Sequence, residues 1–170
     1  INFLEFNCRF GDPETQSILS LLDDSSDLYE IMCRCVRGES LDNIINWKKN
    51  TKSINIVLSH VLYPYKKAPE PLLFKINDAL KDKLTKNNGD YGNILNVANI
   101  SYEDGKYTTT GGRVLSIVVF GNDFTQCFKR AYDLCKDIIY KNKYYRRDIG
   151  LQYIIGDNVD NRNNHWEYYP

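Results

Sequence analysis

The sequence predicts an α+β fold, in which a small β-sheet is covered by a long helix. Three observations support this prediction. Short strand-like segments rich in β-branched residues follow one another over residues 53–120, and Asp104-Gly105 gives a hairpin signal between two of them. A segment with helical apolar spacing then follows the strands. Such a helix must bury its apolar stripe, so we expect it to cover one face of the sheet.

The first sixteen residues predict a strand followed by a helix. Strand alternation places Glu5, Asn7 and Arg9 on one face, because successive side chains point to opposite sides. The apolar face then carries Leu4, Phe6, Cys8 and Phe10. We expect a helix from Pro13 to about Leu22, since Asp12 can cap it and a proline suits the first helical position.

A second helix is predicted to end near Gly38 and to lie in the core. Its apolar residues recur with the spacing of one buried stripe: Leu28, Ile31, Met32, Cys35 and Val36. The following segment, Glu39 to Thr51, has mixed composition. We place the domain joint there, with a short helix around Leu41 to Trp47.

Strands are predicted at Ser53 to Ser59, Ile94 to Ile100 and Arg113 to Phe120. A short helix is expected within Leu72 to Leu84. The long helix begins after Asn122 or Asp123, either of which can cap it. Its predicted stripe is Phe128, Ala131, Tyr132, Cys135, Ile138 and Ile139.

Length and composition exclude several classes of protein. The 170 residues suit one domain, or one domain plus a piece of another, and the opening inside a strand without Met predicts a fragment of a longer protein. Lys plus Arg and Asp plus Glu each number 22, so no basic excess favours nucleic acid. No membrane span or signal segment is expected. None of the five cysteines forms a C-x-x-C pair, so we expect reduced, packed thiols in a cytoplasmic protein.

Three groups of polar residues are candidate functional sites. Glu5 and Asn7 could supply oxygen ligands to a hard cation such as Mg²⁺, with Arg9 one step further along; the alternative is a strand with a solvated polar face. Gly111-Gly112 could let the backbone approach a ligand, or could simply form a turn. In the segment Tyr144 to Gly150, two arginines could bind phosphate oxygens, and the Asp could hold a guanidinium or accept ribose hydroxyls. The alternative for this segment is a solvated cluster after a helix.

Three segments resemble one family. E-F-N-C-R-F-G-D-P-E-T-Q at Glu5 to Gln16, G-G-R-V-L-S at Gly111 to Ser116 and Y-R-R-D-I-G at Tyr145 to Gly150 resemble glycinamide ribonucleotide synthetase, also called phosphoribosylamine-glycine ligase, of the ATP-grasp superfamily. The resemblance implies that residues 1–50 are the C-terminal end of an ATP-grasp domain. It implies that residues 51–150 form a small C-terminal substrate-binding domain. Residues 151–170 are a tail to which no structure is assigned.

The resemblance also implies an activity. The carboxylate of glycine would attack the γ-phosphate of ATP to give glycyl phosphate. The amine of 5-phosphoribosylamine would then displace phosphate, giving glycinamide ribonucleotide in de novo purine biosynthesis. The implied partners are these substrates and the missing N-terminal part of the same enzyme. The fragment alone is expected to be inactive, because the ATP-binding segments are absent.

By the same resemblance, Glu5 and Asn7 would hold Mg²⁺ or Mn²⁺, and Arg9 would stabilise charge on the transferring phosphoryl group. Asp12 would orient the ammonium group of glycine, unless it serves only as a helix cap. The phosphoribosyl group would meet Arg113, Arg146, Arg147 and Asp148.

Two departures from the family pattern keep other functions open. The family's S-G-G-Y-P-G turn retains only Tyr63-Pro64 here, and its H-A-G-T segment is replaced near Ala98 to Ser101. One alternative is a diverged, non-catalytic remnant that acts as an interaction or regulatory domain. Another is an ATP-grasp ligase that joins a different acid and amine.

Overall fold

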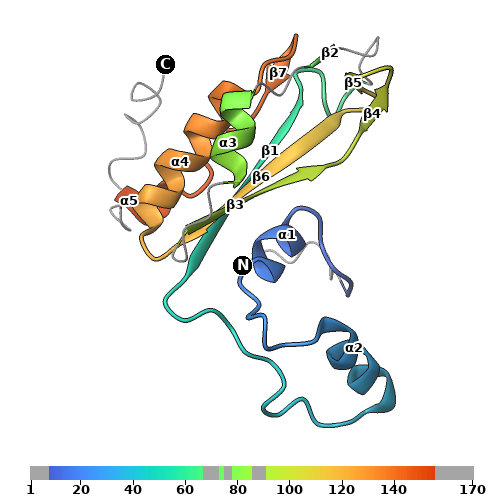
Figure 1. Cartoon of the computed structure of the whole chain (residues 1–170), viewed down its shortest axis with the longest axis vertical. Helices are drawn as coiled ribbons and strands as arrows, with labels where there is room; N and C mark the ends of the chain where they lie inside the picture. The colour runs from blue at the N-terminus through green and yellow to red at the C-terminus, as the bar shows by residue number, and fades with distance from the viewer. Residues whose placement is uncertain (1–7, 67–72, 75–77, 86–90, 156–170) are drawn as a thin grey trace.

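The computed structural model describes residues 8–66, 73–74, 78–85 and 91–155, and the structural statements below concern these residues. They form a mixed α/β structure with a four-stranded sheet in the order β3-β6-β1-β7 and a three-stranded sheet in the order β2-β5-β4 (Figure 1). The elements in chain order are α1 (Glu14–Leu19), α2 (Leu28–Arg37), β1 (Lys52–His60), β2 (Leu73–Phe74), α3 (Asp78–Thr85), β3 (Tyr91–Val97), β4 (Ile100–Glu103), β5 (Lys106–Thr109), β6 (Arg113–Gly121), α4 (Phe124–Asp137), β7 (Lys143–Tyr144) and α5 (Leu151–Ile155). No described helix has the length and apolar run that a bilayer crossing requires.

The core lies between the four-stranded sheet and α4. Every pair of neighbouring strands in this sheet is antiparallel, and Ile56 of β1 lies opposite Ile117 of β6. Because side chains alternate along each strand, one face of the sheet is a continuous apolar surface. That face buries Ile54, Ile56, Leu58, Leu115, Ile117 and Val119. Figure 1 shows α4 and α3 on this side of the sheet, with α1 on the opposite side.

The cap predicted for α4 is confirmed at Asp123, whose side chain accepts hydrogen bonds from the backbone N–H groups of Thr125 and Gln126 at 2.8 and 3.2 Å. Four of the residues predicted for its apolar stripe are buried: Phe128, Ala131, Tyr132 and Cys135. Ile138 is also buried, although it follows the helix as its C-cap. The prediction is wrong at Ile139, which is 71% exposed because the helix has already ended at Asp137.

The opposite face of the sheet meets α1. The Asn55 Nδ2 donates to the Pro13 carbonyl at 2.9 Å, and the Ser53 hydroxyl donates to the Ser17 carbonyl at 3.0 Å. This helix is shorter than predicted, and Pro13 occupies the cap position without a side-chain hydrogen bond. The prediction that Asp12 caps α1 is therefore wrong. The Asp12 carboxylate instead bonds to two other side chains, described below.

The boundaries predicted for α2 are confirmed, but its place in the core is wrong. Asp27 caps its start, and Gly38 ends it with a φ of 67°, a conformation that glycine adopts without strain. No α2 residue is buried, and Val36 is 88% exposed. Figure 1 shows the reason: α2 lies beyond α1, away from the sheet, so no described element covers its apolar stripe.

Two further predictions fail near the start of the chain. Cys8, Arg9 and Phe10 are exposed and lie outside any strand, so the described end of the predicted opening strand is wrong; Leu4 to Asn7 lie outside the described residues. The segment from Leu41 to Trp47 forms turns instead of a helix. Trp47, at the end of this segment, forms an isolated β-bridge with Leu22, which follows α1.

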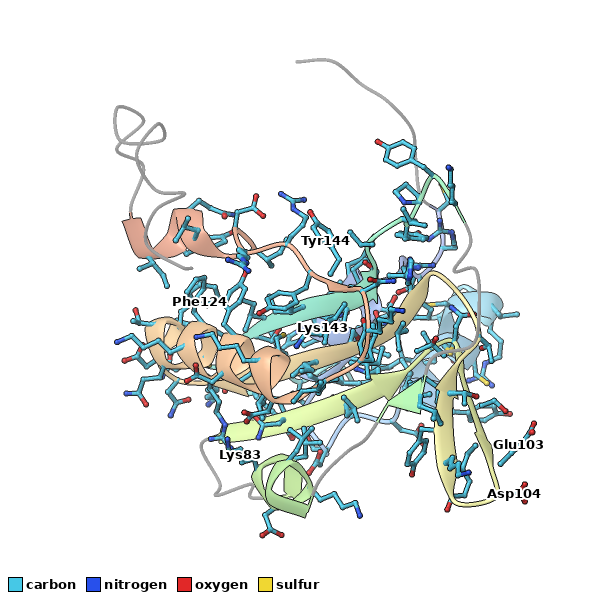
Figure 2. All side chains as sticks on the ribbon, turned by 90° about the horizontal axis from the view of Figure 1, so that it is seen from above. Lys83, Glu103, Asp104, Phe124, Lys143 and Tyr144 are labelled. Atoms are coloured by element: carbon cyan, nitrogen blue, oxygen red, sulfur yellow. The ribbon has the colours of Figure 1, made fainter. Side chains whose placement is uncertain are left out.

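The middle of the chain follows the predictions with shifted boundaries. The hairpin turn is confirmed, with positive φ at Asp104 and Gly105 between β4 and β5. Figure 2 shows Glu103 and Asp104 at its tip, well away from α4. Ile100 opens β4 instead of ending the preceding strand, and the short helix starts only at Asp78.

All five cysteines are unpaired, as predicted. The expectation that they are packed holds for Cys127 and Cys135, which are buried against the sheet, and burial raises the pKa of the Cys135 thiol to about 12. It is wrong for Cys8 and Cys35, which are exposed.

Candidate functional site

A cavity of about 680 Å³ lies on the α1 side of the sheet, and we refer to it as the tyrosine cavity. Its walls come from the start of α1, from β1 and the turn after it, from β6, and from the segment between α4 and α5. Figure 2 labels Tyr144 on this last segment. The lining residues include Pro13, Asn55, Ser59, Tyr63, Pro64, Tyr65, Arg113, Tyr144, Tyr145 and Arg146. The sheet therefore brings two of the arginines predicted to bind substrate, Arg113 and Arg146, to one cavity.

Arg113 is held in place by Asp12, which lies 101 residues away in the sequence. The Arg113 Nη1 lies 3.0 Å from the Asp12 Oδ2, and it also donates to the Asp12 main-chain carbonyl at 3.3 Å. The Asp12 Oδ1 accepts from the Gln16 Nε2 at 3.1 Å. Asp12 therefore positions a guanidinium, a role that the sequence did not indicate.

The segment that departs from the family pattern near Ala98 to Ser101 supports the backbone beside Arg113. The Asn99 side-chain amide donates to the Arg113 carbonyl at 2.6 Å. The Asn99 carbonyl accepts from the Thr110 N–H at 2.9 Å. Asn99, which follows β3, is thus tied to the start of β6.

Arg146 and Asp148 form a two-pronged ion pair. The Arg146 Nε lies 3.0 Å from the Asp148 Oδ1, and its Nη2 lies 2.6 Å from the Oδ2. The Tyr132 hydroxyl donates to the carbonyls of Arg146 and Ile149, so the loop rests on α4. The interpretation that Asp148 holds a guanidinium is confirmed. Both arginines are exposed, but Arg146 lines the cavity and Arg147 does not, which distinguishes the two adjacent residues.

The Arg146–Asp148 pair predicts a pH dependence. Hydrogen bonding from the Arg146 guanidinium lowers the pKa of Asp148 below its ordinary value. Because the folded-state pKa is the lower one, the pair stabilises the fold above the unfolded pKa of about 3.9 and loses this contribution as pH falls through the folded value. An NMR titration of the Asp148 carboxyl carbon should show this lowered pKa, and Arg146→Ala should raise it. An unchanged pKa in that variant would exclude Arg146 as the cause.

The two glycines before β6 are required by packing within the protein. A Cβ at Gly112 would lie 2.3 Å from the Tyr63 ring, and one at Gly111 would lie 2.7 Å from the Asn99 side chain. Neither glycine has a positive φ. These contacts account for both glycines, so no bound ligand is needed to explain them. They also allow the Tyr63 ring to pack against Gly112 at the wall of the tyrosine cavity.

We therefore expect Gly112→Ala to destabilise the protein by about 1–3 kcal/mol, the usual cost of overpacking. Urea unfolding would measure the free energy of unfolding. Adding Tyr63→Ala should recover most of the loss, because it removes the ring that the new methyl group meets. A double variant as unstable as the single one would contradict this explanation.

A second cavity, of about 510 Å³, lies on the other side of α1 over β3, and we refer to it as the β3 cavity. It is lined by Phe10, Gly11, Asp12, Thr15, Gln16, Leu19, Ser20, Ile94 and Asn96. The Asp12–Arg113 pair joins the two cavities, since Asp12 lines one and Arg113 lines the other. Arg9 lines neither, and its Nη1 donates to the Phe10 carbonyl at 3.1 Å.

The predicted metal ligands Glu5 and Asn7 lie outside the described residues. Within the described part of the chain, no group of three or more His, Cys, Asp and Glu side chains could hold a metal ion. The chemistry of Glu5 and Asn7 suits Mg²⁺ or Mn²⁺, since both offer oxygen ligands.

Sequence reasoning missed Asn55 and assigned no role to several other residues of the tyrosine cavity. Asn55 is a carboxamide within a strand of apolar residues, which was an available signal. Tyr144 and Tyr145 directly precede the arginines, and burial raises the pKa of Tyr145. Tyr63-Pro64, the retained part of the family's turn, lies at the cavity wall.

Comparison with known families identifies the region that contains this cavity. Residues 53–152 match the family described as phosphoribosylglycinamide synthetase, C domain. The chain belongs to this family. The matched residues include β1, β6 and the Arg146–Asp148 segment, so most of the wall of the tyrosine cavity lies within the family's domain.

Relatives and solved structures agree with this membership. The chain is 38% identical over 153 residues to a bifunctional purine biosynthetic protein of Dictyostelium discoideum, covering 88% of the chain and 17% of that protein. It is 35% identical over 151 residues to the phosphoribosylamine–glycine ligase of Haemophilus influenzae, covering 88% of the chain and 32% of the ligase. The crystal structure of the corresponding ligase from Thermotoga maritima matches with a TM-score of 0.65 and 27% identity, over 86% of this chain and 32% of that one. The chain thus spans about a third of the length of these two ligases.

Proposed function

We propose that this chain supplies the 5-phosphoribosylamine-binding part of a phosphoribosylamine–glycine ligase. One observation carries the proposal: Arg113 and Arg146 line one cavity, and each is fixed by an aspartate. Guanidinium groups bind phosphate oxygens through paired hydrogen bonds, and a positioned guanidinium loses less freedom on binding. The relatives' names give the substrate that a phosphate-binding cavity in this family would take.

In the proposed reaction, glycine is first activated as glycyl phosphate at the expense of ATP. The amine of 5-phosphoribosylamine then attacks the acyl carbon, and inorganic phosphate leaves as the amide bond forms. The arginines of the tyrosine cavity would hold the 5-phosphate of the sugar and so orient its amine. Holding two reactants in the correct geometry is a large part of such catalysis.

We propose that residues 1–50 belong to an ATP-grasp domain and residues 51–150 to the small substrate-binding domain. The exposed apolar stripe of α2 supports this division. Met32 and Val36 are exposed, although their spacing is that of a buried helix face. An upstream part of the ligase would cover this stripe and supply most of the ATP site.

Glu5 and Asn7 are the residues that would hold Mg²⁺ or Mn²⁺. The ion, when bound, would neutralise charge on the phosphates of ATP. Arg9 would face the transferring phosphoryl group, and it is exposed. Asp12, whose carboxylate already pairs with Arg113, would contact glycine from the β3 cavity.

The proposal is tested by titrating ribose 5-phosphate into the 170-residue chain in a calorimeter. Ribose 5-phosphate carries the same phosphate and sugar, with a hydroxyl in place of the anomeric amine. We expect saturable binding that inorganic phosphate competes away. Absence of binding would contradict the phosphoribosyl role and would favour a non-catalytic interaction domain.

A further inference from the structure

Asn55 lines the tyrosine cavity, and one polar atom of its side chain has no hydrogen-bond partner. It lies in the middle of β1 between the core residues Ile54 and Ile56, so its side chain points to the face that meets α1. Its Oδ1 is buried and accepts no hydrogen bond. Buried carboxamide oxygens nearly always have a partner. Other buried side-chain atoms among the described residues also have no partner, such as the Ser116 Oγ, which lines neither cavity; Asn55 is distinguished because it lines the same cavity as Arg113 and Arg146.

The orientation of the Asn55 amide is fixed by its other half. The Nδ2 donates to the Pro13 carbonyl at 2.9 Å. A flipped amide would bring two oxygen atoms to this distance, which is repulsive. The Oδ1 therefore points away from the Pro13 carbonyl. Its hydrogen bond must come from a donor other than the protein groups that surround it.

We infer that Asn55 is a specificity-determining residue, whose Oδ1 accepts a hydrogen bond from a hydroxyl or amine of a sugar phosphate bound in the tyrosine cavity. The inference rests on the proposed function, because Arg113 and Arg146 would hold the phosphate of the same ligand. The arginines recognise the anion, and Asn55 recognises the sugar or its amine. Phosphate alone presents no such second group, so Asn55 distinguishes the two ligands.

Asn93 provides a matched control. It also lies in the four-stranded sheet, it is buried, and its Nδ2 donates to a main-chain carbonyl, that of Lys83, at 2.9 Å. It lines neither the tyrosine cavity nor the β3 cavity. Asn55→Leu and Asn93→Leu therefore remove similar groups, and only the first removes a cavity acceptor.

The experiment titrates ribose 5-phosphate and, separately, inorganic phosphate into the parent chain and both variants. Asn55→Leu should weaken ribose 5-phosphate binding about tenfold, the usual effect of one lost hydrogen bond, and leave phosphate binding unchanged. Asn93→Leu should change neither. Equal ribose 5-phosphate affinity in Asn55→Leu and the parent would overturn the inference and leave the proposed function standing. A parent that binds no ribose 5-phosphate would overturn both.

A second measurement needs no variant, and so does not depend on Asn55→Leu folding. The ¹³C shift of the Asn55 side-chain carbonyl in the parent should move when ribose 5-phosphate binds and stay in place with inorganic phosphate. The Asn93 carbonyl should not respond to either. An Asn55 signal that is indifferent to bound ribose 5-phosphate would overturn the inference.

Discussion

Replacing Arg113 by Ala is expected to weaken the binding of both ribose 5-phosphate and inorganic phosphate by roughly 10- to 100-fold, the range for a lost hydrogen bond to a charged group. Arg113 lines the tyrosine cavity, and its Nη1 lies 3.0 Å from the Asp12 Oδ2. Calorimetric titration of the two anions would measure the change.

The same substitution should have little effect on stability. The Asp12 and Arg113 side chains are 56% and 36% exposed, and exposed ion pairs contribute only about 0.2–1 kcal/mol. Lys136→Ala, which removes a surface ion pair with Asp133 on α4, is the matched control and should leave both affinities unchanged. A large loss of stability with normal phosphate binding in Arg113→Ala would make Arg113 a structural residue instead.

Replacing Arg146 and Arg147 together should weaken the binding of ribose 5-phosphate at least tenfold, because Arg146 lines the cavity. In the complete ligase, the double variant should mainly raise the concentration of 5-phosphoribosylamine required for half-maximal rate. The single variants separate the two residues: Arg146→Ala should account for most of the effect, since Arg147 does not line the cavity. An effect confined to the ATP requirement would contradict the phosphate role.

Local signals predicted several of the described helix ends and turns, although not the cap or the end of α1. Asp123 caps α4, Gly38 ends α2, and Asp104-Gly105 turns the hairpin. Each of these features depends on hydrogen bonds or φ preferences within a few residues, so the sequence contains the information.

Burial near the start of the chain could not be predicted in this way. The spacing of Met32 and Val36 indicates a helix with an apolar stripe, but whether the stripe is buried depends on what packs against it. No described element covers it. The same holds for Phe10, which is apolar and yet 55% exposed.

The candidate site was predicted in part. The motifs singled out Asp12 and Arg113 separately, and their pairing follows from the position of α1 over the sheet, whereas the Arg146–Asp148 pair is local and was predicted. Asn55 was missed because a polar residue within a short strand gives no indication of which face it occupies until the neighbouring strands are placed. Its role depends on Pro13, which lies 42 residues earlier and reaches it only in the folded chain.

The most direct test of the account is the formation of glycinamide ribonucleotide from glycine, 5-phosphoribosylamine and ATP. The assay would compare the 170-residue chain alone, the upstream part of the ligase alone, and the two joined in one protein. We expect product only from the joined protein, and a strong reduction when that protein carries Arg113→Ala. Product from the chain alone would contradict the proposed division of the enzyme, and a folded joined protein without product would contradict the ligase function itself.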